Sequence, residues 1–97
     1  MNKTYAKSKK TCRVTFELPA EVKADKVFVV GDFNDWNASA HPLKQRKGGR
    51  FSTSISLAAG SQYQFRYLVD GERWENDWAA DAYLPNSFGT ENSVVAV

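Results

Sequence analysis

Alternation of large, mostly apolar residues with polar ones runs through much of this chain and restricts its fold to β-structure. The pattern occupies residues 12–18, 51–57 and 63–69. Such a period of two places one face of a strand against a core and leaves the other in water. Residues 27–30 are continuously apolar, as in a strand buried on both faces. No segment keeps the period of about 3.6 residues typical of an amphipathic helix, so we expect almost no helix.

Turn signals separate these segments. Residues 47–50 and 59–61 contain glycine, which tolerates positive φ, and Asp70-Gly71 is a strong hairpin signal. Residues 76–91 form a long, turn-rich loop, a kind of segment that is usually functional or mobile. Further short strands are expected at 42–47, 73–75 and 93–97. Six to seven short antiparallel strands at this spacing predict an all-β, immunoglobulin-like β-sandwich.

Charge is distributed unevenly along the 97 residues. Residues 1–13 carry five basic side chains and no acidic one, whereas the rest of the chain carries eight basic and eleven acidic side chains. We therefore expect a basic, flexible tail at residues 1–11 and a single folded domain at residues 12–97. A basic tail can contact nucleic acid or an acidic partner, and that alternative stays open.

Three features of the sequence bear on where in the cell the protein is found. Cys12 is the only cysteine, so no disulfide forms within the chain. The basic segment at the start is not followed by the apolar stretch of a secretory signal. No apolar run approaches the roughly 20 residues that a membrane span needs. These features predict a cytoplasmic protein with no membrane partner.

Catalytic and metal-binding patterns are not found in the sequence. His41 is the only histidine, and the carboxylates fall almost entirely in turns, where they commonly serve solubility and local hydrogen bonding. A metal site needs three or four clustered ligands, and a phosphate site of the common kind needs a glycine-rich loop. We therefore expect no enzymatic activity, no catalytic residue, no metal and no cofactor.

All three tryptophans lie in or beside polar turns: Trp36, Trp74 and Trp78. A group of large rings in wet loops, with amide and cationic side chains nearby, predicts a stacking platform for a flat ligand. Nucleic acid would also require a basic groove, but the predicted domain is net acidic. Sugars are neutral and need ring faces together with planar polar side chains, so a sugar is the favoured ligand.

Three motifs resemble carbohydrate-binding module family 48. They are the stretch Val29 to Asn37, the segment 67–71 followed by Trp74, and the stretch Phe88 to Val95. The family includes the early-set domains of glycogen branching enzymes and isoamylases, and the glycogen-binding domain of the AMP-activated protein kinase beta subunit. The motifs occur in the family's order, and the resemblance covers residues 12–97. It implies an early-set sandwich.

The resemblance also implies which residues contact sugar. Two tryptophans would stack on glucose rings, a basic residue and an asparagine would bond hydroxyls, a bulky residue before a glycine would wedge against the chain, and a threonine would add a contact. The implied carbohydrate-binding residues are Trp36, Arg66, Trp74, Phe88, Thr90 and Asn92. Two of them depart from the kinase-type domain, which has lysine at the position of Arg66 and an aliphatic residue at that of Phe88.

The sequence thus predicts a non-catalytic module that binds α-1,4-linked glucans such as glycogen, starch and maltooligosaccharides by tryptophan stacking. The alternative is a protein-interaction or regulatory domain that docks on an amylolytic enzyme or a kinase-type partner. The two differ in whether the isolated chain responds to glucans.

Overall fold

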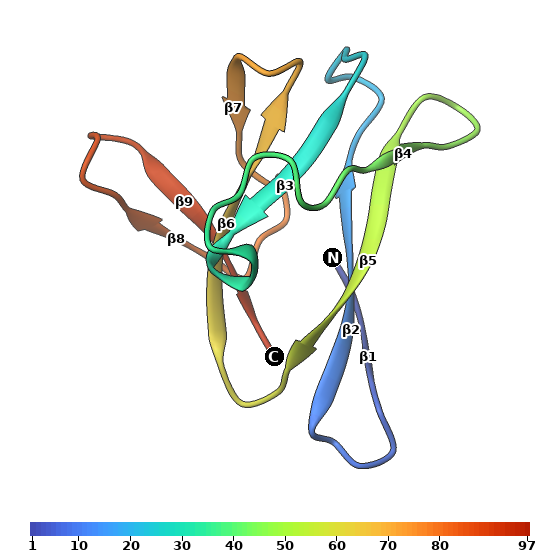
Figure 1. Ribbon diagram of the computed structural model, residues 1–97, viewed down its shortest axis with the longest axis vertical. Helices are drawn as coiled ribbons and strands as arrows, with labels where there is room; N and C mark the ends of the chain where they lie inside the picture. Colours follow the sequence, from blue (N-terminus) through green and yellow to red (C-terminus); the bar gives the residue numbers. More distant parts are fainter.

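A computed structural model describes residues 1–97 and shows two antiparallel sheets packed as a β-sandwich (Figure 1). The first sheet has the strand order β1-β2-β5-β4. Its strands are β1 (Asn2–Tyr5), β2 (Thr11–Leu18), β4 (Lys44–Gln45) and β5 (Phe51–Ala58). The long pair β2 and β5 is in register over eight residues, from Thr11 opposite Ala58 to Leu18 opposite Phe51.

The second sheet has the order β3-β6-β9-β8, and β7 also pairs with β6. Its strands are β3 (Val27–Gly31), β6 (Gln62–Val69), β7 (Arg73–Glu75), β8 (Ala82–Pro85) and β9 (Glu91–Ala96). A single turn of 3-10 helix, η1 (Asp32–Asn34), follows β3 directly. β6 therefore has three neighbours: β3 pairs along one of its edges, and β9 and β7 pair with successive parts of the opposite edge.

The core lies between the sheets and consists of the apolar residues that alternation predicts. Thirteen buried residues form one cluster, with Phe16 and Phe65 meeting edge to face at 5.0 Å between ring centroids. The predicted all-β, immunoglobulin-like sandwich is confirmed. The strand number is nine rather than six to seven, because two of the short strands lie in segments with no inward-pointing apolar pattern. No helix is long and apolar enough to cross a membrane.

Strand β1 lies in the first part of residues 1–11, so the expectation of a flexible tail is wrong for that part of the chain. Asn2–Tyr5 pair with β2 in antiparallel register, and Ala6 donates its N–H to the carbonyl oxygen of Thr11 at 3.0 Å. The Lys3 ammonium lies 2.7 Å from the Asp81 carboxylate. Burial opposes ionisation of Asp81, but hydrogen bonds from Lys3 and from the Ala96 N–H outweigh it and hold the pKa of Asp81 below 3.8. Lys3 thus lies on an edge strand, where charge is common, whereas Lys7, Lys9 and Lys10 lie between β1 and β2 and Arg13 lies on β2.

Residues 76–91 contain strand β8, so the expectation of a loop over this whole segment is also partly wrong. All four residues of β8 are exposed, so its sequence carries no alternation that would reveal it. Asp77 anchors the segment before it, because its buried carboxylate accepts a hydrogen bond from the Tyr67 hydroxyl at 2.7 Å. Burial and the neighbouring Asp77 charge raise the pKa of Tyr67 well above 10.0, so the phenol stays a donor.

Gly31 ends β3 at a point where no side chain fits. A Cβ there would lie 2.5 Å from the carbonyl oxygen of Gln64 and 2.7 Å from the Cβ of Phe65, both on β6. Its backbone is extended, so the requirement is space rather than a special φ angle. The close approach lets the chain turn off β3 into η1 directly beside β6.

The β6–β7 hairpin uses the turn that its sequence predicts. Asp70 and Gly71 both have positive φ, at 55° and 72°, and Glu72 donates its N–H to the Val69 carbonyl oxygen at 3.2 Å, as in a type I′ turn. The Asp70 carboxylate also accepts the N–H groups of Asp25 and Lys26. These bonds, from Lys26 first and then from Asp25, hold the pKa of Asp70 below its ordinary value of 3.8.

Asp70→Asn tests the contribution of this carboxylate to the acid stability of the fold. A lowered folded-state pKa stabilises the fold above the ordinary value of 3.8 and ceases to do so as the pH falls through the folded value. The advantage of the wild type over Asp70→Asn should therefore be full at about pH 6 and shrink as the pH approaches about 2.5. Urea unfolding of both proteins across this range measures it, and a difference independent of pH would contradict the assignment.

Candidate carbohydrate-binding site

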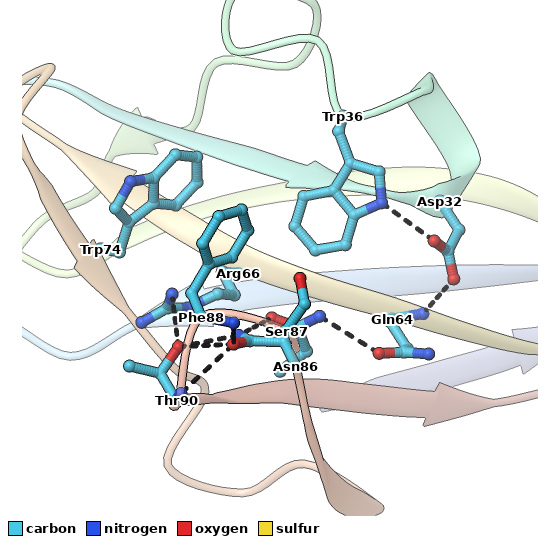
Figure 2. A pocket seen from close by; sticks show the side chains of 10 residues that line it. Asp32, Trp36, Gln64, Arg66, Trp74, Asn86, Ser87, Phe88 and Thr90 are labelled. Atoms are coloured by element: carbon cyan, nitrogen blue, oxygen red, sulfur yellow. Dashed lines mark hydrogen bonds between the residues drawn. The ribbon is translucent and has the colours of Figure 1, made fainter.

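A groove of about 760 Å³ lies on the face of the second sheet that is turned away from the core. Ten residues line it, and they come from η1 and the loop after it, from β6, β7 and β9, and from the turn between β8 and β9 (Figure 2). The lining residues are Asp32, Trp36, Gln64, Arg66, Trp74, Asn86, Ser87, Phe88, Thr90 and Asn92. All six residues that the sequence resemblance implies for sugar contact are among them.

Strand parity explains why β6 contributes polar residues to this groove. Phe65 and Tyr67 are fully buried in the core, so the residues between and before them point to the opposite face. Gln64 and Arg66 therefore form part of the floor of the groove. One strand serves the core with one face and the groove with the other.

Trp36 is held at one end of the groove by an unusual backbone. Asp35 and Trp36 both adopt positive φ, at 54° and 57°, which costs roughly 1–3 kcal/mol for each non-glycine residue. The Trp36 N–H donates to the Gly31 carbonyl oxygen at 2.9 Å. Its indole N–H donates to the Asp32 carboxylate at 2.9 Å (Figure 2). The ring is therefore fixed while 38% of the residue stays exposed.

Asp32 and Asn34 hold this end of the groove together. The second carboxylate oxygen of Asp32 accepts the backbone N–H of Gln64 at 2.7 Å, which ties η1 to β6. The Asn34 amide donates to the Val29 carbonyl oxygen at 3.0 Å and accepts the Gly31 N–H at 3.1 Å. The turn after β3 is thus built from its own polar side chains, and Trp36 projects from it.

Trp74 stands at the other end of the groove, on β7 and opposite Leu68 of β6. The Arg66 guanidinium lies over its ring, 5.7 Å from the centroid, in a cation–π arrangement. Arg66 also donates to the Thr90 hydroxyl at 3.5 Å, and its buried Nε–H has no hydrogen-bond partner in the protein. The terminal guanidinium N–H groups make no other hydrogen bond within the protein, so Arg66 retains donor capacity within the groove.

Phe88 completes the set of rings. It lies at the tip of the β8–β9 hairpin, is 88% exposed and extends over the groove lined by the two tryptophans (Figure 2). An isolated phenyl ring with this exposure makes few contacts with its own protein. The position suits a group that closes over a bound molecule.

A row of amides forms the polar edge of the groove. Asn92 is 9% exposed, and its amide donates to Gln64 at 3.1 Å while its oxygen accepts a hydrogen bond from Asn86 at 3.1 Å. The second N–H of Asn92 and the amide NH₂ of Gln64 remain available as donors. Asp32 and Arg66 are the only charged residues of the lining, one of each sign, so the groove selects for neither anions nor cations.

This composition suits recognition of a neutral polyol. Ring faces and amide and guanidinium donors are present together, while Asp32 is the only carboxylate among the lining residues. Glycoside hydrolysis in most families uses two carboxylates on either side of the scissile bond. No three His, Cys, Asp or Glu side chains are grouped as metal ligands.

Four lining residues were not assigned from the sequence. Asp32 belongs to a motif that was recognised, but its bond to the Trp36 indole depends on the fold of η1. Gln64 precedes Arg66 by two residues, and strand parity alone could have placed both on one face. Asn86 and Ser87 lie in the segment 76–91, which was expected to be a long, turn-rich loop and for which no individual site residue before Phe88 was named.

Trp78 is the one tryptophan outside this groove. It is 62% exposed and lies beside a second hollow of about 730 Å³, which residues such as Glu17, Pro19 and Arg50 line. None of the groove residues lines this hollow. Trp78 thus provides an exposed indole for comparison with Trp36 and Trp74.

Asp32→Ala tests whether this carboxylate positions Trp36. The substitution removes the acceptor of the indole N–H and of the Gln64 N–H, so we expect a loss of about 1–2 kcal/mol in the free energy of unfolding and faster exchange of the Trp36 indole proton. Asp32→Asn, which keeps one carbonyl oxygen, should have an intermediate effect. Denaturant unfolding and NMR hydrogen exchange measure both, and wild-type values for Asp32→Ala would refute the positioning role.

Comparison with known proteins places this geometry in a family. The chain is 49% identical over 43 residues to a 1,4-alpha-glucan branching enzyme of Bradyrhizobium sp. (strain ORS 278), which is 43% of this chain and 6% of that enzyme. It is 43% identical over 49 residues to the branching enzyme of Deinococcus radiodurans, covering 50% of this chain and 7% of the enzyme. The branching enzyme of Salinibacter ruber is 40% identical over 50 residues, which is 50% of this chain and 8% of that enzyme.

The chain therefore spans less than a tenth of the length of these relatives. A family described as the glycogen recognition site of AMP-activated protein kinase matches residues 7–97, almost the whole chain. With the sandwich, the groove and its three aromatic rings already in place, this match identifies the chain as a member of the glycogen-recognition family of carbohydrate-binding modules.

Proposed function

We propose that the groove binds α-1,4-linked glucans and that the chain performs no chemistry on them. The observation that carries the proposal is the convergence of three exposed rings, Trp36, Trp74 and Phe88, with Arg66 and Asn92 in one groove. The chain's membership of the glycogen-recognition family supports the same ligand class.

The chemistry of glucose accounts for each residue type. The C–H face of a pyranose ring is apolar and packs on an indole, so Trp36 and Trp74 stack on glucose units of one chain. The planar guanidinium of Arg66 donates to two neighbouring hydroxyls, and the free N–H of Asn92 donates to another. Phe88 covers the outer side of the glucan, and Thr90 adds a hydroxyl contact. The curvature of an α-glucan suits rings at the two ends of a groove.

The electrical neutrality of the groove sets the conditions of binding. A neutral ligand releases no counterions, so affinity should vary little with salt concentration, unlike that of a nucleic-acid complex. The groove is shallow and holds a few hydrogen bonds, which must offset the lost freedom of the sugar. Affinity for short maltooligosaccharides is therefore micromolar or weaker.

The branching-enzyme relatives suggest a setting for this binding. In a larger protein, a module of this kind would hold a polysaccharide near a catalytic domain. A second proposal is a protein-interaction or regulatory role, docking on an amylolytic enzyme or a kinase-type partner. The exposed Trp78 favours it, because that indole lies outside the sugar groove and is not covered by this chain.

Tryptophan substitutions distinguish these two roles. Binding of maltoheptaose or β-cyclodextrin, followed by isothermal titration calorimetry, should weaken by at least about 30-fold in Trp36→Ala and in Trp74→Ala, corresponding to about 2 kcal/mol for a central aromatic contact. Trp78→Ala is the matched control, since it removes an equally large exposed ring outside the groove, and its affinity should equal that of the wild type.

Undiminished binding in both groove variants would refute the stacking assignment. A wild-type chain that ignores every α-glucan would refute the proposed function itself and favour the docking role.

A further inference from the structure

Asn86 is the most heavily hydrogen-bonded side chain at the tip of the β8–β9 hairpin. Its amide oxygen accepts the N–H groups of Phe88 and Thr90, at 2.9 and 3.2 Å, and lies 3.0 Å from the oxygen of the Thr90 hydroxyl. Its amide nitrogen lies 2.7 Å from the Thr90 hydroxyl and donates to the Asn92 oxygen at 3.1 Å. Its backbone N–H donates to the Thr90 carbonyl oxygen at 2.9 Å.

These bonds use the hydrogen-bonding capacity of the Asn86 side chain. An amide has two N–H donors and two lone pairs, and all four are directed at residues 88, 90 and 92. Asn86 therefore has little left to offer a sugar, although it lines the groove. All three of these residues are among the six that the proposed function assigns to sugar contact.

We propose that Asn86 is a positioning residue, which holds the hairpin tip in its sugar-binding geometry before the sugar arrives. The inference rests on the proposed function and adds a residue that acts through Phe88, Thr90 and Asn92 rather than by its own contact. It has two parts, one for each end of the amide.

The oxygen end fixes the loop that carries Phe88. The phenyl ring is 88% exposed, so its own packing does little to hold the loop. Asn86 binds the backbone on both sides of Gly89. Gly89 has a φ of 78°, and as a glycine it could adopt many other backbone conformations if these bonds were absent. Without these ties the loop would have to be ordered by the sugar, and that ordering would subtract from the affinity.

The nitrogen end fixes the orientation of the Asn92 amide. Because Asn86 donates to the Asn92 oxygen, the Asn92 nitrogen must face Gln64, to which it donates at 3.1 Å. These two hydrogen bonds thereby fix the direction in which the second N–H of the Asn92 amide points. A carboxylate in place of Asn86 would set two oxygens against each other and favour the flipped amide.

Two substitutions separate these parts. Asn86→Ala removes both ends, whereas Asn86→Asp keeps the acceptor for the Phe88 and Thr90 N–H groups and loses the donor to Asn92. Thr15→Ala is the control, because it removes a hydrogen bond to Ser54 on the other sheet, far from the groove in the fold. Affinity for maltoheptaose is measured by calorimetric titration of the wild type and the three variants. Amide hydrogen exchange is measured on the same four proteins without sugar.

We expect Asn86→Ala to bind about tenfold more weakly and to lose protection of the Phe88 and Thr90 amides. Asn86→Asp should retain that protection and still bind several-fold more weakly, and Thr15→Ala should match the wild type in both measurements.

Equal affinities of Asn86→Ala and wild type would overturn the inference while leaving the proposed function intact. Weaker binding by Asn86→Ala with unchanged protection of both amides would overturn the role assigned to the oxygen end, because the Phe88 loop would then be ordered without Asn86. Failure of the wild type to bind maltoheptaose would overturn the proposed function and this inference together.

Discussion

Strand β6 is the constraint on which both the core and the groove depend. Its alternation sends Phe65 and Tyr67 into the core, where they are fully buried, and Gln64 and Arg66 to the opposite face. A slip of one residue in its pairing would exchange these two sets and destroy both at once. Its partners then bring the remaining groove residues beside it, with η1 next to β3, Trp74 on β7 and Asn92 on β9.

Polar side chains at the turns convert this scaffold into a site with fixed rings. Asp32 holds the Trp36 indole and the β6 backbone with its two oxygens. Asn86 holds the opposite wall through its contacts with residues 88, 90 and 92. Trp36 and Phe88 are both exposed, so burial alone cannot hold their rings in place. On the proposed function, the groove is formed before the sugar enters, which would limit the entropy lost on binding.

The sandwich was predictable because alternation and turn chemistry are local signals, and β2, β5 and β6 carry them strongly. The hairpin at Asp70-Gly71 followed from the φ angles that those residues tolerate. β1 and β8 were missed because edge strands pair by backbone hydrogen bonds and need no apolar face. The six predicted site residues came from motifs. The roles of Asp32 and Gln64 depend on a contact between segments distant in sequence, and that of Asn86 depends on the geometry of a turn, neither of which the sequence pattern reveals.

The central claim is that Trp36 and Trp74, and not Trp78, meet the glucan. The most direct measurement is an NMR titration of the ¹⁵N-labelled chain with maltoheptaose, following its three indole N–H signals. The account predicts that the signals of Trp36 and Trp74 shift together along one binding curve while that of Trp78 stays in place. A shift confined to Trp78, or no shift of any indole at saturating sugar, would contradict it.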